Sequence, residues 1–167
     1  MTMVDITELV NRALAHHDKG NYQLAEEMFL EALYLLNDKE NELYQRIVYG
    51  LGMNYGAQGI LDGAGQCFEE GRLNAKKANN IRFELGMIRQ LIAVNRDLGE
   101  LTTALLLVDE EILYREKHAP DDWVGFSTLY FEGSQLLEAA GKTKKSEAYF
   151  RRFLEYKKNS ERQNKQK

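Results

Sequence analysis

Cysteine, proline and long apolar runs are nearly absent from this sequence. Cys67 is the only cysteine, so an intramolecular disulfide is impossible, which favours a reducing, cytoplasmic setting. Pro120 is the only proline, which favours long, uninterrupted helices. No apolar run approaches the roughly 20 residues of a membrane-spanning helix, and the first ten residues show no secretory signal. We therefore expect a cytoplasmic protein that does not interact with membranes.

Charge is distributed unevenly along the chain, whose net charge is −4. Residues 142–167 hold ten Lys or Arg and three Glu, whereas the rest holds twelve Lys or Arg and 23 Asp or Glu. Because no basic stripe runs through the body of the chain, we expect no nucleic-acid partner. The basic end indicates either a solvated C-terminal helix or contact with an acidic surface, including one on a second copy.

Glycines recur at a period near 40 residues. The segments KGNYQLA, QGILDGA, LGELTTA and AGKTKKS align on Gly20, Gly59, Gly99 and Gly141, with spacings of 39, 40 and 42 residues. Apolar residues on both sides of each glycine recur with the period of a helix. Each unit therefore predicts a helix, a glycine turn and a second helix.

Two further marks follow each glycine at fixed distances. The residue five positions later is small, and the residue nine positions later is apolar. In chain order these are Ala25, Ala64, Ala104 and Ser146, and Phe29, Phe68, Val108 and Phe150. A small residue lets two helices approach closely, and the large apolar residue fills the space beside it.

These units resemble tetratricopeptide repeats, and the second unit does so most fully. Its matching residues are Leu51, Gly52, Tyr55, Gly59, Ala64 and Phe68. The period exceeds the usual value of about 34 residues, which resembles the long-repeat branch of peptide-sensing bacterial regulators and kinesin light chains. The resemblance implies an all-α, right-handed solenoid of four helical hairpins.

We expect one repeat domain over residues 1–158, followed by a disordered basic tail at 159–167. The repeats are predicted at about 6–39, 45–79, 81–118 and 121–158. The eight helices are predicted at about 5–18, 22–36, 41–57, 62–78, 81–97, 101–117, 121–140 and 143–158. The last helix is highly charged, so we expect it to cap the array.

No catalytic or cofactor motif is supported by its context. The stretch YGLGMNYGAQG at 49–59 superficially suggests a dinucleotide loop, but it lies in a helical pattern with no preceding strand. His16 and His17 point about 100° apart on a helix and cannot chelate one metal ion well. Cys67 has no adjacent histidine or basic residue, which favours a structural thiol over a nucleophile. We expect no enzyme activity, cofactor or metal.

The resemblance also implies a binding surface, because the first helix of each such repeat lines a concave groove. The candidate partner-binding residues are Arg46, Tyr49, Met53, Asn54, Arg89, Asn95, Arg96, Phe131 and Gln135. The arginines suit carboxylates, the asparagines suit a peptide backbone, and the aromatic residues supply apolar contact. Gly50 and Gly56 are not required by the repeat, and Gly56 is expected to leave room beside Tyr49 and Met53. Alternatively, several of these residues only complete the packing.

The sequence therefore predicts a non-catalytic adaptor that binds a protein or peptide, with some acidic character in the partner. A second hypothesis is a self-associating assembly protein, in which the apolar first unit or the basic helix at 143–158 forms a symmetric dimer. A third is a stand-alone sensor, or a fragment, related to peptide-responsive transcription regulators but without a DNA-binding domain. The third rests on analogy of fold alone.

Overall fold

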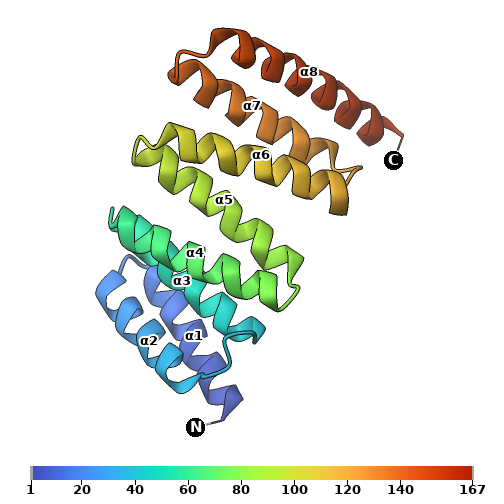
Figure 1. The fold of residues 1–167 in the computed structure, drawn as a ribbon. Helices are drawn as coiled ribbons and strands as arrows, with labels where there is room; N and C mark the ends of the chain where they lie inside the picture. Colours follow the sequence, from blue (N-terminus) through green and yellow to red (C-terminus); the bar gives the residue numbers. More distant parts are fainter. Residues whose placement is uncertain (1, 167) are drawn as a thin grey trace. The chain divides into compact units, whose positions relative to one another are not determined.

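The structure is a computed structural model that describes residues 2–166. These residues form eight α-helices and no strand (Figure 1). The helices are α1 (Met3–Asp18), α2 (Tyr22–Leu35), α3 (Glu42–Ala57), α4 (Leu61–Lys77), α5 (Ile81–Asp97), α6 (Leu101–His118), α7 (Trp123–Ala139) and α8 (Thr143–Lys165). The predicted all-α fold is confirmed. None of the helices described is both long and apolar enough to cross a membrane.

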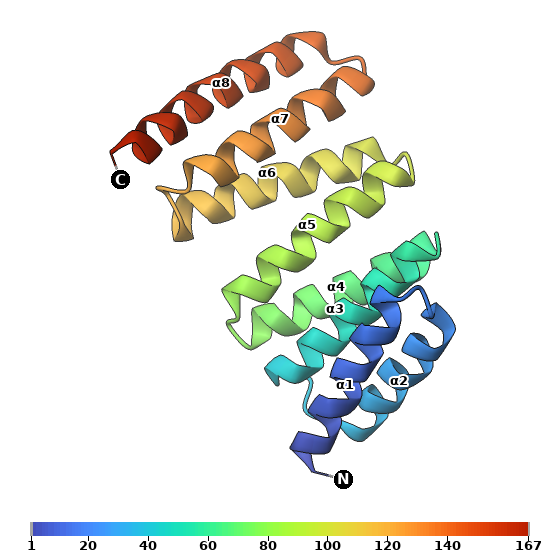
Figure 2. The same ribbon diagram turned by 180° about the vertical axis from the view of Figure 1, so that it is seen from behind.

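The chain divides into two compact units, Met1–Val94 and Asn95–Lys167, where the sequence predicts a single repeat domain. The first unit contains α1 to α4 and most of α5, and the second contains the end of α5 with α6, α7 and α8 (Figures 1 and 2). Within the units, α1 packs with α2, α2 with α3, α3 with α4, α6 with α7, and α7 with α8. This local pattern of contacts is typical of repeats, which do not share one central core.

A glycine in the left-handed region ends the first helix of each predicted pair. Gly20, Gly59, Gly99 and Gly141 have φ angles between 72° and 77°. In each turn the residue after the glycine donates its N–H to the carbonyl five residues earlier, as Asn21 does at 2.9 Å. Other side chains are strained at such angles, which explains why the period of the fold is visible as glycine in the sequence.

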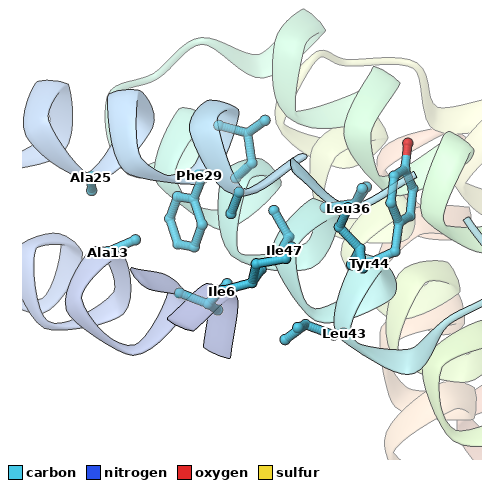
Figure 3. Close-up of a cluster of buried hydrophobic side chains, with 12 residues drawn as sticks. Ile6, Ala13, Ala25, Phe29, Leu36, Leu43, Tyr44 and Ile47 are labelled. Atoms are coloured by element: carbon cyan, nitrogen blue, oxygen red, sulfur yellow. The ribbon is translucent and has the colours of Figure 1, made fainter. Parts of the chain in front are cut away.

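The core of the first unit lies between α1, α2 and α3 (Figure 3). Ile6 from α1, Phe29 from α2 and Ile47 from α3 are buried together there. Ala13 and Ala25 are fully buried where α1 crosses α2, so the small residues predicted from the repeat do lie at a helix contact.

Two glycines of α3 are needed for close packing. A Cβ on Gly52 would lie 2.6 Å from Cε1 of Phe68, which confirms that this position must be small. A Cβ on Gly50 would lie 2.7 Å from Cζ of Phe29. The repeat pattern does not explain Gly50, but the structure does, because this glycine packs against the preceding hairpin. A Cβ on Gly56 would point at α4, where its nearest neighbour is the Cβ of Ala64 at 4.0 Å.

Helix α8 is 23 residues long and continues to Lys165. The sequence prediction ended this helix at residue 158 and placed disorder from 159, whereas residues 159–165 are helical. Glu161, Arg162, Gln163 and Lys165 in this stretch are good helix formers, and no glycine or proline interrupts it. Tyr156 of α8 stacks on Tyr130 of α7 with ring centroids 5.5 Å apart, which holds the middle of α8 in place.

A charged cluster is buried in the second unit. Glu111 on α6 is fully buried and accepts a hydrogen bond from Nε of Arg115, one turn later, at 2.9 Å. Arg115 also pairs with Asp122, whose side chain caps α7 by accepting the N–H of Gly125 at 2.9 Å. Glu111 lies twelve positions after Gly99, where the first two units have the small residues Ala32 and Gly71. The neighbouring guanidinium explains how a glutamate is tolerated at this buried position.

Candidate protein-binding surfaces

A patch of half-buried side chains from α3 and α5 lies in the first unit. We call it the α3–α5 face, and it consists of Arg46, Tyr49, Met53, Gly86, Arg89 and Gln90. The side chain of Gln90 donates a hydrogen bond to the hydroxyl of Tyr49 at 3.0 Å, which joins the two helices. A Cβ on Gly86 would lie 3.9 Å from the ring of Tyr49, so α5 passes close beside it.

The helical period explains why these side chains share a face. Arg46, Tyr49 and Met53 are spaced three and four residues apart, which places them on one side of α3. Val48 and Leu51 lie on another side and are buried against the helices of the first unit. Four predicted binding residues, Arg46, Tyr49, Met53 and Arg89, thus belong to this face.

The two arginines of this face differ in their surroundings. Arg46 is half-buried and makes no hydrogen bond or ion pair with any residue in the described range 2–166. Arg89 already interacts with another group of the chain. A partly buried guanidinium without a partner is a strong site for a carboxylate, since its five N–H donors match the geometry of the carboxylate.

The prediction that Asn54 binds a peptide backbone is wrong. Asn54 is 0% exposed. Its Nδ2 donates to the carbonyl of Tyr22 at 2.9 Å, and its Oδ1 lies 3.0 Å from Nδ1 of His17. The amide therefore joins α3 to the first hairpin, and such a buried amide must be satisfied within the protein.

The remaining predicted residues belong to the second unit. Asn95 is half-buried near the end of α5 and interacts within the chain. Arg96 lies 3.2 Å from a carboxylate oxygen of Asp97 and 3.4 Å from one of Glu132. Because the chain itself already supplies carboxylates to Arg96, this arginine is a weaker site for an anion than Arg46.

Helices α7 and α8 border a hollow of about 650 Å³ in the second unit. We call it the α7–α8 hollow, and its lining includes Phe131, Gln135, Glu138, Thr143, Phe150 and Arg151. Two predicted binding residues, Phe131 and Gln135, are thus brought together. The ring of Phe131 packs against that of Phe153 with centroids 5.0 Å apart. This contact holds the apolar ring of Phe131 in place in the lining of the hollow.

Sequence reasoning missed the part of the hollow that comes from α8, because it considered only the first helix of each repeat. One signal was available. The apolar mark nine positions after the glycine is covered in the first three units, in which Phe29, Phe68 and Val108 are buried. Phe150 carries the same mark in the fourth unit but is 43% exposed.

Cys67 and Tyr55 are among the titratable groups near α4 whose pKa is raised. Burial raises the pKa of the Cys67 thiol to about 11, and the carboxylates of Glu70 and Glu26 add to this effect. Burial also raises the pKa of Tyr55 to about 12, with help from the hydrogen bond that its hydroxyl donates to Glu26 at 2.9 Å. Both shifts favour the neutral form, so these groups are structural rather than reactive.

We expect Cys67 to react slowly with thiol reagents in the folded protein. Because its pKa is raised to about 11, the thiolate is scarce at neutral pH and grows until the pH passes that value. Alkylation by iodoacetamide, followed by mass spectrometry, should be at least about tenfold slower than in urea at pH 8. An equal rate in the two conditions would contradict the assignment.

Comparisons with known proteins identify the fold. A family model for the tetratricopeptide repeat matches residues 9–38, which include most of the first hairpin. TPR-like repeats from Podosopora anserina, assigned to a kinesin light chain, superimpose with a TM-score of 0.82 at 14% identity, over 96% of this chain and 79% of theirs. The fold is that of tetratricopeptide repeat proteins. The predicted resemblance is therefore confirmed.

Other solved structures share this tetratricopeptide fold. BtubC (BKLC) from P. vanneervenii has a TM-score of 0.82 at 14% identity over 93% of this chain, which spans 64% of the BtubC chain. MamA has a TM-score of 0.74 at 17% identity, over 94% of this chain and 81% of its own. No curated protein matches the sequence. Tetratricopeptide repeats provide extended surfaces for contact with other proteins.

Proposed function

We propose that this protein is a non-catalytic adaptor that binds a peptide of acidic character on the α3–α5 face. The observation that carries the proposal is Arg46, a half-buried residue whose guanidinium has no hydrogen-bond or ion-pair partner among residues 2–166. Tyr49 beside it is fixed by the hydrogen bond from Gln90, so its ring offers a rigid apolar contact. A cation next to a fixed aromatic ring suits a peptide in which an acidic residue adjoins an apolar one.

The small residue at Gly86 supports the same proposal. An added Cβ would lie 3.9 Å from the ring of Tyr49, so a longer side chain at this position would lie over the ring, whereas glycine leaves that space open. A peptide can therefore approach the ring closely, and partial burial strengthens its charge contact with Arg46 relative to a fully exposed pair.

Peptides selected from a random library against the wild-type protein provide the test. We expect acidic residues to be enriched, and Arg46→Met to weaken the selected peptides at least about tenfold, because it removes a charge-assisted bidentate contact. Gly86→Leu should weaken them as well, by filling the space beside Tyr49. Fluorescence anisotropy measures both effects.

Arg12→Met is the matched control, since Arg12 is an exposed arginine on α1 and lies outside the α3–α5 face. This control variant should bind the peptides with the same affinity as the wild type. Selected peptides without acidic residues, or peptides that bind equally well to the Arg46→Met variant, would rule out this function.

A second function, self-association, is favoured by a separate observation on α8. Phe150 is 43% exposed and Leu154 is 48% exposed, four residues apart on a helix with no buried residue. Two large apolar side chains on one side of a highly charged helix suit contact with another protein surface. We propose that a second copy of this chain supplies that surface.

A further inference from the structure

On the first hairpin, the place beside α1 and α2 is filled by α3. Gly50 packs against Phe29, and Asn54 bonds to groups of both α1 and α2. The contacted residues lie six and three positions before Gly20 and two and nine positions after it, and they are Leu14, His17, Tyr22 and Phe29. Phe29 is 0% exposed, with Gly50 of α3 directly against its ring.

The same positions on the last hairpin line the α7–α8 hollow. Counted from Gly141, they are Gln135, Glu138, Thr143 and Phe150. Phe150 is the counterpart of Phe29 but is 43% exposed. The hollow is therefore the place where a following helix would pack, and α8 is the last helix of the described residues. Its occupant should be a helix with an apolar centre.

Helix α8 itself carries such a sequence. We call it the α8 stripe, and it consists of Glu147, Phe150, Leu154, Lys157 and Glu161. The spacings of three, four, three and four residues place these side chains on one side of the helix, as in a pair of packed helices. All of them except the two apolar residues are charged, and all are exposed.

The stripe is nearly symmetric about its centre, between Phe150 and Leu154. If two copies of α8 pack antiparallel about a two-fold axis at this centre, Phe150 of each faces Leu154 of the other. Glu147 of each copy then faces Lys157 of the other, so opposite charges meet twice. Other registers lose this match and bring together helices whose segment 142–167 is strongly basic.

We propose that α8 of a second copy occupies the α7–α8 hollow and forms a two-fold symmetric dimer through the α8 stripe. The proposal rests on the self-association proposed above and involves only the second unit. In this dimer, α8 of the second copy runs antiparallel to α8 of the first. The first unit already contains such a pair, because α3 runs antiparallel to α2 (Figure 1). The length of α8 also suits this pairing. Its 23 residues are enough for the whole stripe, from Glu147 to Glu161, to lie on one continuous helix.

Charge reversal on the full chain tests the register. Sedimentation velocity over a wide concentration range should show a concentration-dependent dimer for the wild type. Glu147→Lys and Lys157→Glu should each raise the Kd at least about tenfold, because each places like charges together twice. The double variant should restore the Kd to within about threefold, because the pairs reform with exchanged signs.

Phe150→Ser combined with Leu154→Ser should abolish the dimer, and Leu113→Ser is the matched control. Leu113 is a 66% exposed apolar residue on α6, outside the stripe, and its loss should leave the Kd unchanged. Circular dichroism checks that each variant keeps its helices.

The outcomes separate the two levels of the proposal. A monomer at every concentration would overturn both the α8 pairing and self-association. If the Kd of the dimer does not change in the charge-reversal variants, or if the double variant does not return to the wild-type Kd, the pairing through α8 is wrong. Self-association by another surface would then still be supported. Restored affinity in the double variant supports the register, because recovery requires position 147 of one copy to face position 157 of the other.

Discussion

Replacing Gly52 with alanine is expected to lower the free energy of unfolding by about 1–3 kcal/mol, because the added methyl group overpacks the core. The new Cβ would lie 2.6 Å from Cε1 of Phe68, and this ring is itself buried with its centroid 5.9 Å from that of Tyr49. Alanine is the better helix former by about 1 kcal/mol, so any loss must come from this contact. Urea unfolding followed by circular dichroism measures the change.

Gly56→Ala on the same helix is the matched control. Its Cβ would have only the Cβ of Ala64 nearby, at 4.0 Å, which is an ordinary contact. Here the helix propensity of alanine should dominate and stabilise the protein by about 0.5–1 kcal/mol. Phe68→Leu should recover part of the loss in the Gly52→Ala background. Changes of the same sign at Gly52 and Gly56 would show that contact with Phe68 does not limit this position.

Replacing Arg115 with methionine is expected to cost about 3–5 kcal/mol of stability in the second unit, since it leaves a buried carboxylate without its cation. Glu111 is fully buried and receives the hydrogen bond from Nε of Arg115 at 2.9 Å. The same guanidinium pairs with Asp122 at the start of α7, so the change also weakens that helix end. The midpoint and slope of a denaturant curve report the loss.

Removing both charges should destabilise the protein less than removing the cation alone. The double variant Glu111→Ala, Arg115→Met places at position 111 the residue type that Ala32 provides in the first unit, and leaves no buried carboxylate there. Lys39→Met is the control for an exposed pair, because Lys39 lies 3.4 Å from Glu70 with both side chains largely in solvent. It should cost less than about 1 kcal/mol. An Arg115→Met variant as stable as the Lys39→Met variant would contradict the buried-pair argument.

The candidate surfaces were only partly predictable. Helical spacing places Arg46, Tyr49 and Met53 on one side of α3, because the period that places side chains on one face is set by the backbone. The partner of Tyr49, Gln90 on α5, was not predicted, because it depends on how two helices 41 residues apart meet. The contribution of Phe150 to a surface was missed for the same reason.

The sequence by itself determined the helix pairs, the glycine turns and the small residues at the helix crossings of the repeat. These are local properties, since hydrophobic period and a left-handed glycine act over a few residues. Only the tertiary structure decided that Asn54 and Glu111 are buried, that Gly50 is required and that Phe150 is exposed. Burial depends on which helix packs on a side chain from elsewhere in the chain, so residues with the same place in the repeat, such as Phe29 and Phe150, differ in exposure.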